Sequence, residues 1–161
     1  MLNSLAHQLL KQLPGNTNSL CIAFSGGLDS RFLLHLAHTA CQLAKQQSQT
    51  YPALSLRAVH VHHGFSANAN AWASFCQDCC NQLGIQLAIH KVEPNKLAGA
   101  SLEDRARRAR YGVFEAELQA NEVLLQGHHQ NDQAETLLLN LMRGSGSLGL
   151  SGIPASRPLA K

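Results

Sequence analysis

The chain alternates short apolar runs with longer segments in which apolar residues recur every three to four positions. A short apolar run bounded by Gly, Pro, Asn or Ser is typical of a buried strand, whereas the longer period is typical of a helix packed on one side. Strands that alternate with helices favour a parallel sheet covered by helices. The sequence therefore predicts an α/β fold with an open, mainly parallel, twisted sheet and helices on both of its faces.

The expected strands and helices follow one another in a regular order. We expect strands at 20–24, 56–62, 85–92 and 123–126, and helices at 2–13, 29–44, 70–83, 101–120 and 132–142. Ser101, with Asp104 three residues later, resembles a capping box at the start of the fourth helix. The buried stripe of that helix is expected to comprise Leu102, Ala106, Ala109, Val113 and Leu118. Residues 143–161 are rich in Gly and Ser and are expected to form a loop.

Length and composition limit the class of protein. A chain of 161 residues with 45% hydrophobic and 14% charged residues is typical of one globular domain. Its net charge of +3 permits an anionic partner without requiring one. Since no apolar run approaches the ~18 residues of a membrane span and residues 1–13 lack the pattern of a signal peptide, we expect no membrane association. Five cysteines, an odd number in a chain of this size, favour free thiols and a cytoplasmic location.

Six residues at the point where the strand at 20–24 meets the helix at 29–44 carry the most chemical information. These residues, which we call the glycine loop, are Ser25, Gly26, Gly27, Leu28, Asp29 and Ser30. Two glycines allow a sharp turn and a close approach of ligand to backbone, and a helix N-terminus offers N–H groups to a phosphate. Asp29 is suited to hold Mg²⁺ against phosphate oxygens. The pattern is not that of a Walker loop, and its alternative is an ordinary turn with a Ser or Asp cap.

A second polar cluster follows the strand at 123–126. It contains His128, His129, Asp132 and Glu135. Because the carboxyl ends of parallel strands share one crevice, we expect this cluster to face the glycine loop. Asp132 and Glu135 lie on one face of the first turn of a helix, where capping by acids is the alternative explanation. Adjacent histidines on a strand end point to opposite sides, so at most one of the two is expected to reach the site.

The helix at 101–120 is rich in arginine. It contains Arg105, Arg107, Arg108 and Arg110. Two of them have an acid four residues earlier: Arg107 has Glu103, and Arg108 has Asp104. Such pairs are typical of a solvated, ion-paired helix face. Arg105 and Arg110 have no acid at that spacing, and a guanidinium binds phosphate through paired hydrogen bonds. One of these two arginines is therefore a candidate for a phosphate contact.

Histidines and cysteines raise the question of a metal site. His60, His62 and His63 end the second strand at the expected edge of the crevice. His60 and His62 share a face of the strand, but no second pair of ligands follows at a spacing typical of zinc. Cys76 and Cys80, four residues apart in a predicted helix, are more simply explained as small core residues.

Taken in order, these segments resemble the tRNA(Ile)-lysidine synthetases, within the wider group of N-type ATP pyrophosphatases. The resemblance runs over about residues 20–154. It rests on four ordered motifs: SGGLDS; HVHHG followed by SANANAW; RARRARY; and HHQNDQAET leading through LLLNLMRGSGSLGLSGIP. It implies a Rossmann-like fold of the adenine nucleotide α-hydrolase type and a single ATP pyrophosphatase catalytic domain over residues 1–161. Since the family normally continues past this region, we expect a catalytic domain that belongs to a longer protein.

The resemblance also implies a reaction. ATP, with Mg²⁺, would adenylate the C2 oxygen of the wobble cytidine of an isoleucine tRNA with a CAU anticodon, and pyrophosphate would leave. The ε-amine of free L-lysine would then displace AMP and leave lysidine. This chemistry needs positioning and charge neutralisation at the α-phosphate rather than a protein nucleophile. A homodimer is compatible with it.

The roles implied by the resemblance fall on residues of the four motifs. The ATP-binding residues would be Ser25, Gly26, Gly27, Leu28, Asp29, Ser30, His60 and His63, and the catalytic residues Asp29, Asp132 and Arg110. Asp132 and Glu135 would bind the lysine ammonium, Asp29 would hold Mg²⁺, and His128, Arg107 and Arg143 would line the site. The group often has an acid directly before Asp132, but this chain has Asn131. That departure argues against a metal site built on two adjacent carboxylates.

Two other functions are compatible with the glycine loop. A tRNA thiolation enzyme of the same fold would need sulfur-carrying or cluster-binding cysteines at the crevice, and Cys76 and Cys79 are the candidates. We expect both to lie within a helix and away from the strand ends, which argues against thiolation. The second alternative is a module that binds a nucleotide without catalysis.

Overall fold

The computed structural model describes residues 1–64, 68–93, 101–127 and 159. Residues 1–126 form one compact unit, and residues 127–161 form a second unit that falls almost wholly outside this description. The first unit contains α1 (Leu2–Gln12), β1 (Ser19–Ala23), α2 (Leu28–Gln46), β2 (Ser55–His62), α3 (Ala69–Gln82), β3 (Gln86–Lys91), α4 (Leu102–Glu117) and β4 (Glu122–Leu125). Each of these elements was predicted, with ends shifted by three residues or fewer. The helix expected at 132–142 lies outside the described residues.

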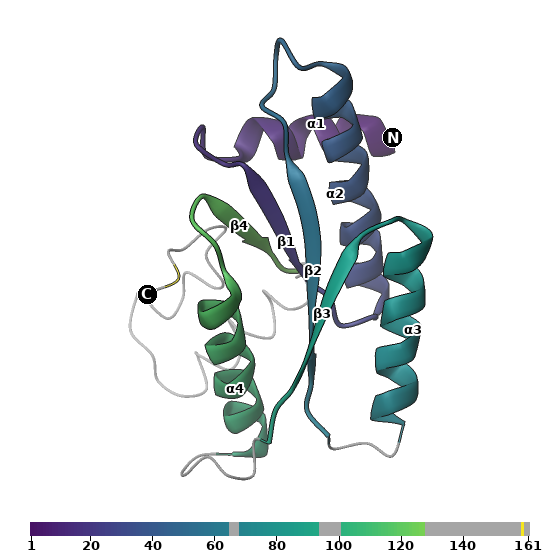
Figure 1. The fold of residues 1–161 in the computed structure, drawn as a ribbon, viewed down its shortest axis with the longest axis vertical. Coiled ribbons are helices and arrows are strands. Elements are labelled where there is room, and N and C mark those ends of the chain that lie inside the picture. The colour runs from purple at the N-terminus through teal and green to yellow at the C-terminus, as the bar shows by residue number, and fades with distance from the viewer. Residues whose placement is uncertain (65–67, 94–100, 128–158, 160–161) are drawn as a thin grey trace, which may run out of the picture. The chain divides into compact units, whose positions relative to one another are not determined.

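The four described strands form one parallel sheet in the order β3-β2-β1-β4. Ser19, which opens β1, is in register with Ser55 of β2 and Glu122 of β4. Figure 1 shows that the carboxyl ends of β2 and β3 lie at the same edge of the sheet as the first turns of α3 and α4. The predicted α/β fold with a parallel sheet is confirmed.

Alternate residues of β1 pack against helices on opposite faces of the sheet. Leu20 and Ile22, with Phe24 directly after the strand, belong to a buried cluster with Leu34 of α2 and Cys76 of α3. Cys21 of β1 instead packs with Val59 of β2 and Phe114 of α4. Helices therefore cover both faces, as predicted, with α2 and α3 on one side and α4 on the other (Figure 1). No helix among the described residues has the length and apolarity needed to cross a bilayer.

The start of α4 was predicted correctly, and its buried stripe was predicted in part, since Val113 and Leu118 pack against the cluster that contains Phe114. The Ser101 hydroxyl accepts a hydrogen bond from the Asp104 N–H at 3.2 Å, which confirms the N-cap. Leu102, expected to be buried, is 46% exposed, whereas Phe114, absent from the expected stripe, is only 2% exposed. The residues of α4 that join the sheet cluster lie in its second half, so the first turn buries little apolar surface. Phe114 therefore takes the central buried position of α4, with Val113 and Leu118 partly buried in the same cluster.

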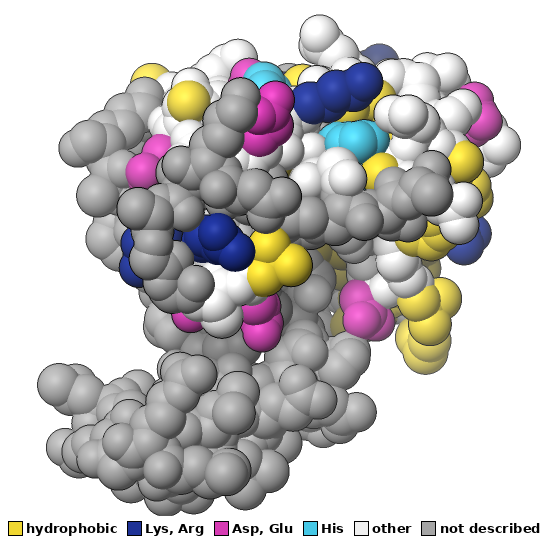
Figure 2. All heavy atoms as spheres, turned by 90° about the horizontal axis from the view of Figure 1, so that it is seen from below, with side chains coloured by type: hydrophobic (Ala, Val, Ile, Leu, Met, Phe, Trp, Pro, Cys, Tyr) yellow, Lys and Arg dark blue, Asp and Glu magenta, His cyan; other side chains and the backbone are white. Residues whose placement is uncertain are grey.

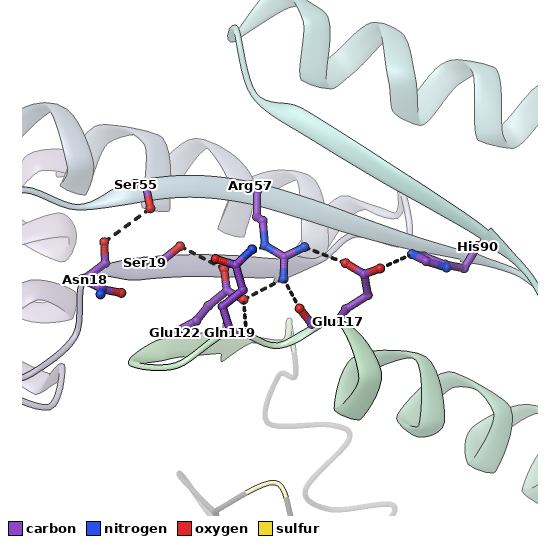
Figure 3. A network of polar contacts seen from close by, with 8 residues as sticks. All are labelled: Asn18, Ser19, Ser55, Arg57, His90, Glu117, Gln119 and Glu122. Atoms are coloured by element: carbon purple, nitrogen blue, oxygen red, sulfur yellow. Dashed lines mark hydrogen bonds and ion pairs between the residues drawn. The ribbon is translucent and has the colours of Figure 1, made fainter. Parts of the chain in front are cut away.

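A polar network fixes the end of α4 beneath the sheet (Figure 3). Arg57 of β2 donates from Nε and Nη2 to the two oxygens of Glu122, at 2.8 and 2.6 Å. It also donates to the Glu117 carboxylate at 2.9 Å and to the Glu117 carbonyl at 2.7 Å. The other oxygen of Glu117 lies 2.8 Å from His90 Nε2 of β3. One guanidinium therefore links β2 to the end of α4 and the start of β4.

The Glu122 carboxylate explains why α4 ends at Glu117 rather than at residue 120. Glu122 accepts the N–H of Gln119 at 3.1 Å, and Asn121 turns the chain with a φ of 60°. Burial disfavours the charged carboxylate of Glu122, but hydrogen bonds from Arg57, Gln119 and Ser19 outweigh this and hold its pKa below the usual value. The turn into β4 is therefore built around a charged acid in its ionised form.

Candidate functional site

The glycine loop joins β1 to α2 at the carboxyl edge of the sheet. Gly26 has a φ of 82°, a left-handed conformation that glycine adopts without a steric penalty. A Cβ at Gly26 would lie 2.8 Å from Cys76 Sγ and 3.1 Å from Trp72 Nε1. Gly27 is the N-cap of α2 in an extended conformation. The first glycine is therefore required both by the turn and by the close approach of α3.

The two serine hydroxyls of the loop brace the turn. The Gly27 N–H donates to Ser25 Oγ at 3.4 Å, Ser25 Oγ donates to Ser30 Oγ at 3.0 Å, and Ser30 Oγ donates to the Gly27 carbonyl at 3.0 Å. Ser30 is buried beneath the loop. In this arrangement both hydroxyl hydrogens form hydrogen bonds within the loop. The Ser25 hydroxyl could therefore donate to a phosphate only after it rotates.

Backbone amides of the loop have the character of an anion site. Gly26 is buried, yet its N–H forms no hydrogen bond with any residue that the structure describes. A buried backbone N–H without a partner is rare in folded proteins. Nor does a side chain cap the N-terminus of α2. The unpaired amide and the adjacent helix N-terminus together favour a phosphate-sized anion at this position.

Two exposed residues stand in the first turn of α2. Leu28 is 80% exposed, and Asp29 presents its carboxylate on the same turn. No group of three or more His, Cys, Asp or Glu side chains among the described residues could hold a metal ion on its own. Asp29 by itself suits Mg²⁺, which takes one or two carboxylates and completes its shell with waters and phosphate oxygens.

His60 lies directly beneath the loop, where it is only 5% exposed. Its Nδ1 is 2.8 Å from the carbonyl of Phe24, the residue that precedes Ser25. Because a carbonyl only accepts, Nδ1 must carry the hydrogen. Burial lowers the pKa of His60, although its bond to Phe24 opposes this. The neutral ring thus supports the backbone at the base of the loop and leaves Nε2 as an acceptor, which can bind an amino or hydroxyl group but supplies no positive charge.

His63, Arg110 and their neighbours bring α4 to the end of β2. Burial lowers the pKa of His63, and the positive charge of Arg110 lowers it further. Burial also lowers the pKa of Arg110, and the charge of Arg107 adds to this effect against the opposing effect of Tyr111. Arg110 forms no ion pair with an acid in the part of the chain that the structure describes. A partly buried, unpaired guanidinium next to a histidine gains most from an anion.

The predicted ion pairs along α4 are absent from the described residues. Ion pairs there involve only Arg57 and His90, so neither Glu103 with Arg107 nor Asp104 with Arg108 is in contact. The Asp104 carboxylate instead accepts the Ser101 hydroxyl at 2.9 Å, and the Arg107 guanidinium lies 5.4 Å from the centre of the Tyr111 ring. Arg105, the other candidate for a phosphate contact, has a buried Nε without a hydrogen bond to a described residue. Seen from the carboxyl ends of the strands, basic, acidic and histidine side chains share this face with hydrophobic ones (Figure 2).

One cysteine, Cys76, lies closer to the glycine loop than expected. All five are free, as predicted, and Cys76 and Cys80 are buried core residues of α3. The prediction that Cys76 lies away from the strand ends is wrong, because its Sγ packs beneath the loop, 3.6 Å from His60 Nδ1. Burial raises the pKa of Cys76 to about 12 and that of Cys80 to about 11. Such thiols are inert at neutral pH, unlike the thiolates that carry sulfur or ligate a cluster.

Several predicted site residues lie outside the described residues: His128, Asp132, Glu135 and Arg143. Their proximity to the glycine loop stays a prediction. Conversely, sequence reasoning missed Trp72, which contacts the loop through its indole nitrogen. The signal for it was weak, because a single aromatic residue in the SANANAW segment is equally typical of a helix core.

Comparisons with known proteins agree with this geometry. A family model described as a PP-loop domain matches residues 1–161. The chain is 54% identical over 140 residues to a tRNA(Ile)-lysidine synthase of Pseudomonas fluorescens and 52% identical over 139 residues to one of Pseudomonas aeruginosa. These matches cover 87% and 86% of the chain but only 30% and 29% of the relatives. The U34-tRNA thiolase NcsA from Methanococcus maripaludis, solved with its 4Fe-4S cluster, matches with a TM-score of 0.62 and 19% identity over 91% of this chain and 51% of its own. That likeness shows a shared fold.

Proposed function

Because the chain belongs to the PP-loop domain family, we propose that it binds ATP at the glycine loop and provides the nucleotide site for lysidine formation on an isoleucine tRNA. The observation that carries the ATP half is the buried Gly26 amide, unpaired among the described residues, at the N-terminus of α2. The lysidine half rests on relatives up to 54% identical that are named tRNA(Ile)-lysidine synthase. The chain spans about 30% of their length, so the activity of a whole relative is part of the proposal.

The proposed reaction has two steps. The C2 oxygen of the wobble cytidine attacks the α-phosphorus of ATP, the bond to the β-phosphate oxygen breaks, and pyrophosphate leaves. The lysine ε-amine then attacks C2, loses a proton, and expels AMP with the former C2 oxygen. Neither step needs a protein nucleophile, so the protein contributes orientation and neutralisation of charge.

The described residues suit these demands in distinct ways. The amides of Gly26 and of the first turn of α2 would hold the pyrophosphate portion of ATP. Asp29 would hold Mg²⁺, which neutralises phosphate charge when bound. Arg110, whose partly buried charge has no acid within reach among the described residues, would contact phosphate or tRNA. His60 and His63 would contribute uncharged hydrogen-bonding groups to the nucleotide, since burial lowers the pKa of each.

Other parts of the proposal come from the sequence motifs. Asp132 and Glu135 would bind the ammonium of free L-lysine, since a cation in a cleft requires carboxylates. His128, Arg107 and Arg143 would line the site. The five free thiols suit a reducing compartment, and we place the reaction in the cytoplasm. A homodimer is compatible with this scheme.

Two measurements test the proposal. Calorimetry with Mg²⁺ and a non-hydrolysable ATP analogue should detect binding to the 161-residue chain, and Asp29→Asn should weaken it about tenfold or more, as loss of a charged ligand does. Asp78→Asn, an exposed acid on α3, is the matched control and should leave binding unchanged. AMP release that depends on both lysine and isoleucine tRNA tests the ligation. A wild-type chain that binds no analogue at millimolar concentration would refute the ATP site, and AMP release independent of lysine would refute the ligation.

A further inference from the structure

Trp72 is the chain's single tryptophan, and it lies against the glycine loop from α3. Its Nε1 donates to the Ser25 carbonyl at 2.5 Å, across the space left open by the missing Cβ of Gly26. The ring is 48% exposed and packs at a tilt against Phe75, with 5.4 Å between the ring centres. The indole thus contacts main-chain atoms of the loop without filling the position at which an anion would bind to the Gly26 amide.

The direction of one peptide group follows from this contact. The peptide bond between Ser25 and Gly26 is trans, so its C=O and N–H point in nearly opposite directions. Since Trp72 holds the Ser25 carbonyl toward α3, the Gly26 N–H must point away from α3. This is the amide that has no partner among the described residues.

Without such a contact the Ser25–Gly26 peptide group could adopt two orientations. Glycine adopts positive and negative φ with similar ease, so the peptide group before Gly26 can rotate at low cost. Rotation would direct the Ser25 carbonyl, an acceptor with a partial negative charge, toward a bound phosphate. A hydrogen bond from the indole, which packs against Phe75, selects the orientation in which a donor meets the anion instead.

We propose that Trp72 is a positioning residue that fixes the Ser25–Gly26 peptide group so that the Gly26 N–H faces the triphosphate. This inference rests on the proposed ATP site and extends it to a residue that the four-motif resemblance gave no role. It makes a specific prediction: loss of the indole N–H weakens binding of the phosphates and leaves binding of the nucleoside unchanged.

Because Trp72 is the only tryptophan, global replacement of tryptophan in an auxotrophic host changes this position alone. The replacement is β-(3-benzothienyl)alanine, in which sulfur takes the place of the indole N–H at nearly constant shape. Calorimetry on the 161-residue chain compares a non-hydrolysable ATP analogue with adenosine. We expect the dissociation constant of the analogue to rise about three- to tenfold, the range for one neutral hydrogen bond, while that of adenosine stays within about twofold. Asp78→Asn, an exposed substitution on the same helix and away from the indole, is the control and should leave both constants unchanged.

The outcomes separate the two claims. If the wild-type chain binds the analogue and the replacement leaves that affinity unchanged, the role of Trp72 is wrong and the ATP site stands. Equal losses for the analogue and for adenosine would show general damage to the site and would also overturn the positioning role. A wild-type chain that binds no analogue would refute the ATP site itself, and the positioning role with it.

Discussion

Gly26→Ala is the substitution that most directly tests the geometry of the loop. It adds one methyl group at a residue whose φ is 82°, where a side chain is disfavoured. The methyl carbon would lie 2.8 Å from Cys76 Sγ and 3.1 Å from Trp72 Nε1. The thiol is buried and the indole is held by the Ser25 carbonyl, so neither neighbour yields easily.

The expected loss of stability has two unfavourable contributions and one favourable one. A left-handed conformation costs a residue with a Cβ about 1–2 kcal/mol. Overpacking against the thiol and the indole adds about 1–3 kcal/mol. The stiffer unfolded chain of an alanine variant returns about 0.4–1 kcal/mol. Gly26→Ala should therefore lower the free energy of unfolding by about 1–5 kcal/mol.

Urea unfolding followed by circular dichroism at 222 nm measures this loss, and two glycines of the same chain provide controls. Gly27→Ala, at a negative φ with its nearest neighbour 3.5 Å away, should change stability by less than about 1 kcal/mol. Gly112→Ala, within α4 and with open space around it, should stabilise the chain by about 0.5–1 kcal/mol.

A double variant separates the steric cost from the conformational one. Cys76→Ala removes the closest atom, so Gly26→Ala should be less damaging by about 1 kcal/mol in that background. The reasoning is refuted if Gly26→Ala costs no more than Gly27→Ala. It is refuted in its steric part if the two substitutions at Gly26 and Cys76 are simply additive.

Three further predictions concern the sheet and the residues beneath the loop. Arg57→Met should lower the free energy of unfolding in urea by about 3–5 kcal/mol, because it leaves the buried Glu122 carboxylate uncompensated. Arg108→Met, at an exposed position, is the control and should change the free energy of unfolding by less than about 0.5 kcal/mol. Equal effects of the two substitutions would contradict this account of the network. Burial lowers the pKa of His60 below 6.5, so the unfolded chain binds a proton more readily, and stability falls as the pH drops from about 6.5 through the pKa of the folded state. His60→Asn, which keeps an N–H donor, should reduce the slope of unfolding free energy against pH in that range. An unchanged slope would show that His60 is not its source. Cys76, whose pKa burial raises to about 12, should react with iodoacetamide at pH 8 far more slowly in the native chain than in urea, as mass spectrometry would show; similar rates would contradict its burial.

Local patterns in the sequence were sufficient to predict the sheet and the loop. β1 and β2 are apolar runs bounded by polar residues, and they are parallel neighbours in the sheet. A continuous apolar run is typical of a strand in a parallel sheet, because helices cover both faces of such a sheet. The glycine loop was recognisable because Gly26 and Gly27 stand between a strand and a helix. Both inferences depend on residues that are close together in the chain, and such inferences need no knowledge of tertiary contacts.

Features that join distant segments could not be read in this way. The network of Arg57, Glu117, Glu122 and His90 combines three strands, β2, β3 and β4, with the end of α4. The spacing of these residues in the sequence does not reveal which of them are partners. The indole of Trp72 reaches Ser25 across 47 positions of the chain. The burial of Phe114 was missed for a related reason, since the apolar positions of α4 fit more than one stripe until the sheet selects between them.

The contact between the only indole and the glycine loop gives the native chain an optical property. Excited at 295 nm, the protein emits from one residue, which touches the main chain at the proposed nucleotide site. We expect a ligand that enters there to alter the polarity and the quenching groups around a half-exposed ring, so its binding should change the emission wavelength and intensity without a label. The same signal follows the loop during rapid mixing, at the moment when nucleotide arrives.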